Sequence, residues 1–206
     1  MIFLVLVPAV SFALFSHTLF HTASMIQFDR TIHTFFESWS TPSTLSFFRW
    51  ITYWGEWRFL FPFLLAFSVL LLFCRSWKAA ILLFISCTIG MRLNAALKVF
   101  FGRERPEPFD PSLLPPSLAY PSGHAFGALV FYFLLFYAVG ALWPGNPLRK
   151  AGWWIVSLWI FLIGLSRVGL GVHWASDVVG GYLAGAFWIS LTLWIGRKGK
   201  VWHATR

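Results

Sequence analysis

The sequence predicts an all-α integral membrane protein with six transmembrane helices and an interfacial helix between the first two. The first observation is composition: 58% of the 206 residues are apolar and only 11% are charged, against a charged share of about 25% in soluble proteins. The second is a series of six apolar stretches, each close to the roughly 20 residues that span a bilayer. The third is an uneven distribution of charge between the loops. The length suits a single membrane-embedded domain over residues 1–206.

The six spans are bounded by charged residues and by clusters of glycine and proline. They cover residues 2–23, 59–74, 79–97, 124–143, 151–169 and 178–196. The first could be a signal peptide, but it lacks a basic leading segment and its apolar run exceeds the usual length of about 7–15 residues, which favours a retained helix. The second is short, and Arg58 and Arg75 at its ends can extend their charged groups to the two membrane surfaces.

An amphipathic helix is expected between the first two spans. Its apolar side chains recur at helical spacing: Phe28, Ile32, Phe35, Phe36 and Trp39. Polar side chains occupy the other side: Asp29, Arg30, His33 and Glu37. Such a helix lies along the membrane surface. It either covers the outer ends of the spans or forms a wall for a lipid tail, and the sequence leaves both interpretations open.

In the last span, Gly181 and Gly185 form a small-xxx-small pattern. This pattern lets another helix approach closely. Packing within the chain is favoured over a dimer interface, and the sequence predicts no oligomeric state.

The charges of the loops define the topology. Six spans place eight basic and no acidic residues on the side of the two termini, and eight basic and all seven acidic residues on the opposite side. By the positive-inside rule the first side is cytoplasmic. The formal net charge of +9 therefore reflects membrane topology, and no nucleic-acid partner is expected. We expect a bacterial-type inner (plasma) membrane protein with cytoplasmic termini and a periplasmic, or extracytoplasmic, site.

Three cations near the outer membrane surface suggest a ligand. Lys98, Arg105 and Arg167 must each reach water or find an anionic partner there. An arginine fork matches phosphate oxygens and lysine adds a point charge, so together they can hold a phosphoryl group. Each of them alone could simply anchor the chain at the membrane surface.

Two further groups reach the same face. Ser122 and Gly123 precede an apolar helix, whose first backbone N–H groups are free to bind an anion, and His124 follows them. His173 and Asp177 are four residues apart, which on a helix places both on one face, where the carboxylate can fix the imidazole tautomer. An isolated pair of this kind is more often structural, but the three cations, the anion-binding turn and the two histidines all reach one membrane face, and together they predict a phosphate site.

These residues form three motifs: Lys98-x6-Arg105-Pro106, Pro121-Ser122-Gly123-His124 and Ser166-Arg167-x5-His173-x3-Asp177. All 11 fixed positions match, and the pattern over residues 98–177 resembles the signature of the type 2 phosphatidic acid phosphatase superfamily.

The resemblance implies a role for each residue. His173 would attack phosphorus, Asp177 would orient it, and His124 would protonate the leaving lipid oxygen before water cleaves the phosphohistidine. Lys98, Arg105, Ser122, the Gly123 amide and Arg167 would bind the phosphate. No metal ion and no other cofactor is implied.

The expected function is therefore a membrane lipid phosphatase whose partners are a lipid phosphate substrate and the bilayer. Phosphatidylglycerol phosphate, undecaprenyl diphosphate and phosphatidic acid all remain candidate substrates, because the cations recognise phosphate and not the tail. A lipid phosphotransferase with the same site is one alternative. An anion transporter is another, although few ionisable groups lie in the middle of a span to mark a pathway.

Overall fold

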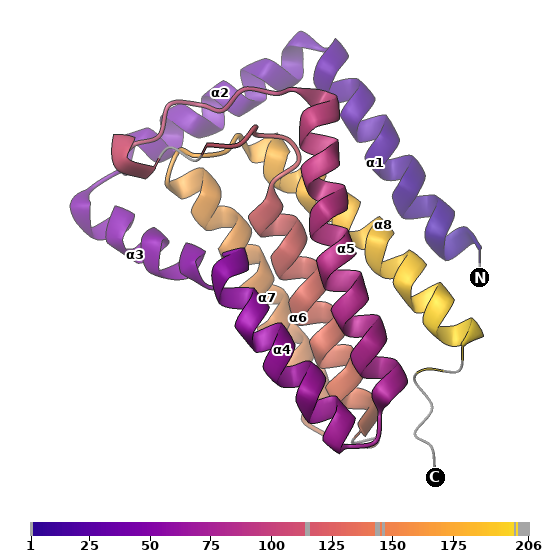
Figure 1. The fold of residues 1–206 in the computed structure, drawn as a ribbon. Coiled ribbons are helices and arrows are strands. Elements are labelled where there is room, and N and C mark those ends of the chain that lie inside the picture. Colours follow the sequence, from indigo (N-terminus) through magenta and orange to yellow (C-terminus); the bar gives the residue numbers. More distant parts are fainter. Residues whose placement is uncertain (1, 114–115, 143–144, 146, 200, 202–206) are drawn as a thin grey trace.

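The protein is a bundle of membrane-spanning helices (Figure 1). The computed structural model describes residues 2–113, 116–142, 145, 147–199 and 201. Within these residues, six helical stretches are long and apolar enough to cross a membrane, which confirms the predicted spans. They contain α1 (Phe3–His21), α4 (Trp57–Phe73), α5 (Trp77–Phe101), α6 (Gly123–Leu142), α7 (Arg149–Gly169) and α8 (Ala175–Lys198).

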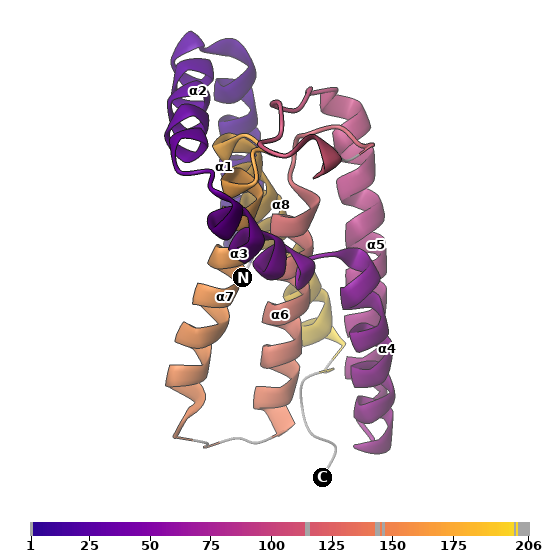
Figure 2. The same ribbon diagram turned by 90° about the vertical axis from the view of Figure 1, so that its left-hand side faces the viewer.

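Two helices, and not one, connect the first two spans. α2 (Ala23–Ser38) is the predicted interfacial helix, and α3 (Pro42–Tyr53) follows it. Thr41 caps α3 through the backbone N–H of Thr44, and Pro42 occupies the first turn, where a missing N–H costs nothing. Figure 2 shows α2 gathered with the α5–α6 loop and the α7–α8 turn at one end of the bundle.

One residue of α2 differs from its expected environment. Asp29 was predicted on the polar side of the helix, yet it is only 2% exposed. Ile32 and Phe36 pack against the core, whereas Phe28 and Phe35 remain exposed on the outer surface of the helix. The face of α2 toward the bundle is therefore apolar with one buried carboxylate.

The core is built around α6. Phe126, Val130 and Leu134 are almost fully buried and pack with residues of α4, α5 and α8. Because each neighbouring helix contacts α6, the start of α6 is fixed relative to the ends of α5 and α7.

Glycines of α8 allow a very close approach to α6. A Cβ atom on Gly181 would lie 2.6 Å from the Ser122 carbonyl oxygen, and one on Gly185 would lie 3.1 Å from Leu129 Cδ2. The interpretation of this pair as packing within the chain is confirmed. The close approach also lets the Ser122 N–H donate to the Asp177 carbonyl oxygen at 2.9 Å, which ties the turn before α6 to the first turn of α8.

Candidate active site

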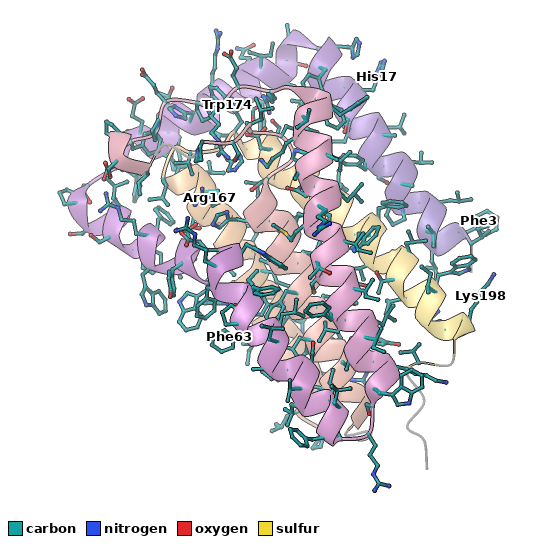
Figure 3. The ribbon with its side chains drawn as sticks, in the orientation of Figure 1. Phe3, His17, Phe63, Arg167, Trp174 and Lys198 are labelled. Carbon is teal, nitrogen blue, oxygen red and sulfur yellow. The ribbon has the colours of Figure 1, made fainter. Side chains whose placement is uncertain are left out.

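The predicted site residues lie at one end of the bundle, on elements far apart in the sequence. Lys98 is in the last turn of α5, Ser122 directly precedes α6, Gly123 and His124 begin it, and Arg167 lies in the last turn of α7. Arg105 belongs to the α5–α6 loop, His173 to the α7–α8 turn and Asp177 to the first turn of α8. Figure 3 shows Arg167 and Trp174 in this end of the molecule.

His173 and Asp177 form a buried pair. Nδ1 of His173 lies 3.2 Å from Oδ2 of Asp177, and the two side chains are 1% and 0% exposed. The same oxygen accepts the Trp174 backbone N–H at 2.9 Å. An ionised carboxylate can only accept hydrogen bonds, so this contact assigns the imidazole proton to Nδ1 and leaves the lone pair on Nε2.

The surroundings of His173 favour its neutral form. Burial lowers its pKa well below 6.5, and the positive charges of Arg105, Arg167 and Lys98, with His124 nearby, lower it further. Five of the predicted residues therefore act on one another electrostatically. A neutral imidazole with an unprotonated Nε2 is the form that a nucleophile requires.

Arg105 lies directly against Nε2 of His173. Its Nη1 donates to His173 Nε2 at 2.9 Å and to the Val172 carbonyl at 2.5 Å. Its Nε donates to the Ser117 carbonyl at 2.6 Å, and Nη2 donates to the Leu118 carbonyl at 3.2 Å. Burial lowers the pKa of this guanidinium to about 10, so it still carries its charge at neutral pH. The side chain is thus held across the site by carbonyls of two separate segments.

Lys98 is held by the same loop. Its Nζ donates to the carbonyls of Leu118 and Ala119 at 2.6 and 2.9 Å. An ammonium group has three donors, so one remains for another acceptor. Gly123 begins α6 beside it, because a Cβ there would lie 3.9 Å from Lys98 Cε and 3.2 Å from Asn94 Oδ1. The absence of a side chain lets Asn94 and Lys98 lie close to the start of α6.

Several polar atoms of the site have no protein partner. Among the described residues, five buried side-chain polar atoms lack a hydrogen bond, and three belong to Ser122 (Oγ), His124 (Nε2) and Arg167 (Nε); the others are in Trp54 and Ser68. Each such atom costs about 1–3 kcal/mol when it is left unsatisfied. All three groups can donate a hydrogen bond to an anion, His124 when its proton is on Nε2.

Two charged residues of the site were not predicted. Nη1 of Arg103 lies 2.6 Å from Asp177 Oδ1, and Nη2 lies 2.6 Å from Asp29 Oδ2. Arg103 stands in the spacer of the first motif, where its charge was visible in the sequence but its partners were not. Asp29 was noted only as part of a polar helix face.

Two uncharged neighbours were also missed. Thr52 of α3 accepts a hydrogen bond from Arg167 Nη1 at 2.6 Å. Gly55 packs against His124, because a Cβ there would lie 3.1 Å from His124 Cδ2. Both belong to the segment between α2 and α4, and no local sequence signal connects them with residues more than 60 positions away.

A cavity lies beside Arg103 and Arg105, the two arginines that contact Asp177 and His173. Its volume is about 410 Å³. The lining residues are Ile26, Asp29, Arg30, Arg103, Glu104, Arg105 and Trp174. Arg105 therefore both contacts His173 and lines this cavity.

Fold and site together define a multi-pass helical membrane protein with a cationic histidine site at one end of the bundle. The family profile described as the PAP2 superfamily matches residues 78–200, a segment that contains every predicted site residue. The chain therefore belongs to the PAP2 superfamily of membrane phosphatases.

The curated proteins that are similar in sequence include two named phosphatases. Phosphatidylglycerophosphatase B of Bacillus subtilis (strain 168) is 33% identical over 137 residues, or 66% of this chain and 66% of that protein. An undecaprenyl-diphosphatase of Sulfolobus acidocaldarius is 35% identical over 140 residues, or 65% of this chain and 63% of that protein. The chain thus matches just under two thirds of the length of each relative.

Two solved structures are similar in fold. One is described as the first transmembrane PAP2-type phosphatidylglycerolphosphate phosphatase from Bacillus subtilis; it superimposes with a TM-score of 0.87 at 26% identity and covers 94% of this chain and 96% of its own. The other, LpxE of Aquifex aeolicus, has a TM-score of 0.51 at 25% identity and covers 83% of this chain and 96% of its own. The likeness to the first extends over nearly the whole bundle.

Proposed function

We propose that this protein hydrolyses a membrane lipid phosphate through a phosphohistidine on His173, without a metal ion. One observation carries the proposal: the unpaired atoms of Ser122, His124 and Arg167 occur in the same buried site as a neutral imidazole surrounded by cations. A phosphoryl group supplies the negative charge and the acceptor oxygens that these groups need. The membership of a phosphatase family supports the reaction class.

In the proposed first step, Nε2 of His173 attacks phosphorus. Arg105 now donates to this nitrogen and must turn toward the phosphate oxygens to free the lone pair. The N–P bond forms as the P–O bond to the lipid breaks, and His124 donates a proton to the leaving oxygen. Asp177 stabilises the positive imidazole that forms, because its carboxylate accepts a hydrogen bond from Nδ1–H and stays negatively charged.

In the second step, water attacks the phosphohistidine. His124, now without its proton, accepts one from the water, so that the N–P bond breaks and free phosphate leaves. Lys98, Arg105, Arg167, Ser122 and the Gly123 N–H would hold the transferred group in both steps. A covalent intermediate divides one difficult displacement into two easier ones.

The substrate proposal follows the relatives and the chemistry of the site. One relative is named a phosphatidylglycerophosphatase and another an undecaprenyl-diphosphatase, so both lipids are candidates, together with phosphatidic acid. The cations of this chain contact phosphate oxygens in every case. Recognition of the tail requires only an apolar surface.

We also propose that the site faces the extracytoplasmic side and that both termini are cytoplasmic. The support is the distribution of charge, because the loops on the site's side contain every acidic residue and the opposite side contains only basic ones. Accessibility of a single cysteine introduced at Ser117, compared with one at Ser76, to a membrane-impermeant thiol reagent in intact cells tests this. Both native cysteines, the exposed Cys74 and the buried Cys87, are first changed to alanine.

The reaction is tested by free phosphate released from a panel of lipid phosphates in EDTA, with wild-type protein and His173→Ala compared in detergent. We expect release by the wild type that the substitution abolishes. Release that stops in EDTA and returns with a divalent ion would refute the metal-free reaction. Phosphate transfer to an added acceptor lipid with no release into water would identify a phosphotransferase instead.

A further inference from the structure

We propose that Arg103 and Asp29 are positioning residues of this reaction: they hold Asp177 in the orientation that fixes the tautomer of His173. The inference rests on the proposed function. It assigns a catalytic purpose to α2, which the sequence presented only as a helix on the membrane surface.

The two oxygens of Asp177 have different partners. Oδ2 accepts from His173 Nδ1 at 3.2 Å and from the Trp174 N–H at 2.9 Å. Oδ1 accepts from Arg103 Nη1 at 2.6 Å. The strongest and shortest of these contacts is the charged one, so Arg103 determines the plane of the carboxylate that the imidazole must meet.

Arg103 is itself fixed by Asp29. Nη2 of the guanidinium donates to Asp29 Oδ2 at 2.6 Å, and Nη1 also donates to Ser176 Oγ at 2.7 Å. Asp29 in turn accepts from the Ser176 N–H at 2.9 Å and from its hydroxyl at 2.5 Å. These bonds form a closed ring between α2, the α5–α6 loop and the first turn of α8.

Charge balance explains why the ring holds together. Asp29 and Asp177 are both buried, and the guanidinium between them is the cation that each one contacts directly. Removal of Arg103 would leave two buried carboxylates near each other without that cation. A buried carboxylate lowers the stability of the protein unless it is paired with a positive charge. The carboxylate of Asp177 would then be free to rotate away from His173 or to take up a proton.

A simple docking function for α2 would need only one of these contacts. The bond between Arg103 and Asp29 is sufficient to attach α2 to the loop. The second bond of the same guanidinium goes to the residue that orients the nucleophile, and Trp174, the neighbour of the nucleophile, stacks near Arg103 with the ring centroid 5.9 Å from Cζ. The arrangement therefore extends the orienting chain from His173 through Asp177 and Arg103 to Asp29.

The test compares kcat, KM and the thermal midpoint in detergent for Arg103→Gln, Arg103→Lys and Asp29→Asn. We expect Arg103→Gln to lower kcat by about 10- to 100-fold, the range seen when partners that orient metal ligands are removed. KM should change by less than about threefold, because an interaction that acts only on the transition state changes kcat alone. Arg103→Lys should restore part of kcat, since an ammonium can still reach Asp177.

The matched control is Arg49→Gln. Arg49 is 44% exposed and forms an ion pair with Asp110 away from the catalytic pair, so its loss should leave kcat unchanged. A lower thermal midpoint with an unchanged kcat per folded Arg103→Gln molecule would overturn the inference and reduce the ring to a docking contact. If Arg103→Gln does not fold, Asp29→Asn and Arg103→Lys decide: a kcat within twofold of wild type in both refutes the inference.

Failure of the proposed function has a different result. In that case the wild type releases no phosphate, or His173→Ala retains its activity. When the wild type is active, His173→Ala is inactive and Arg103→Gln is fully active, the reaction stands and only the inference about positioning is wrong.

Discussion

Replacement of Asp177 by asparagine tests the core of the proposed mechanism with the smallest change in shape. The carboxylate receives three donors, because Oδ2 accepts from His173 and the Trp174 N–H while Oδ1 accepts from Arg103. An asparagine has one acceptor oxygen and one NH2 group. The NH2 group, itself a donor, must therefore face either Arg103 or the donors that Oδ2 now accepts from.

Both orientations of the asparagine damage the site. If its oxygen stays with Arg103, the NH2 group faces His173 Nδ1, which must give up its proton; the proton then sits on Nε2, and the nucleophilic lone pair is lost. If the oxygen faces His173, the NH2 group opposes the Arg103 guanidinium, and that charge loses a buried partner. The first orientation retains the charged hydrogen bond to Arg103 but also leaves the Trp174 N–H without its acceptor, so neither orientation preserves the arrangement that the attack requires.

The expected loss in kcat is about 10³- to 10⁴-fold, as in serine proteases, where the same substitution leaves histidine in the wrong tautomer. This corresponds to about 4–5.5 kcal/mol of activation free energy. Single-turnover hydrolysis followed by acid quenching measures it, because the total phosphate cleaved from the lipid is counted whether or not it has left the protein. The control is Asp110→Asn, the same chemical change at a carboxylate paired with Arg49 outside the site. A folded Asp177→Asn protein with a rate within tenfold of wild type would refute the orienting function of Asp177.

Three further predictions follow from the site and its packing. First, burial and then the neighbouring cations hold the pKa of His173 in the folded protein well below 6.5, the value expected in the unfolded chain. Between these two pKa values the unfolded chain binds one proton more than the folded protein. The contribution of His173 to stability is therefore complete above pH 6.5 and decreases as the pH falls below it. Thermal midpoints in detergent from pH 8 to pH 5 measure this, and a midpoint that rises on acidification would contradict it. Gly181→Ala places a Cβ 2.6 Å from the Ser122 carbonyl oxygen and should destabilise the protein by about 1–3 kcal/mol; an unchanged denaturation midpoint would show that α8 can move away from the turn without cost. Vanadate should inhibit competitively as a phosphate mimic, since the cations and the unpaired donors can bind either anion. Hydrolysis unaffected by about millimolar vanadate would argue against the proposed phosphate site.

The membrane spans could be predicted because the bilayer imposes a simple rule. A chain that crosses hydrocarbon must satisfy its backbone internally, so each crossing is an apolar helix of roughly 20 residues, and such stretches are visible without any tertiary information. α3 follows no such rule. Residues 42–53 form an apolar helix that lies outside the predicted spans, and the capping by Thr41 is the local signal that could have identified it.

The site was predictable to the extent that its residues share motifs. The spacing of His173 and Asp177 on one turn of helix is a local property, and the structure places the pair in contact. The contacts of Arg103 with Asp29 and of Arg167 with Thr52 join residues 74 and 115 positions apart. Such pairs depend on how α2 and α3 pack over the bundle, which the sequence pattern of neither segment determines.

The location of Asp29, Thr52 and Gly55 has a consequence for how this protein can be divided. The family segment, residues 78–200, contains every predicted catalytic and phosphate-binding residue, yet these three partners precede it. A fragment that begins at α5 would therefore contain the whole signature while Arg103 and Arg167 each lacked a partner that fixes their direction. A cut between α4 and α5 would yield two fragments, and the complete site would form only when they reassociate. Catalytic activity of such a split protein would therefore report directly on the assembly of the bundle.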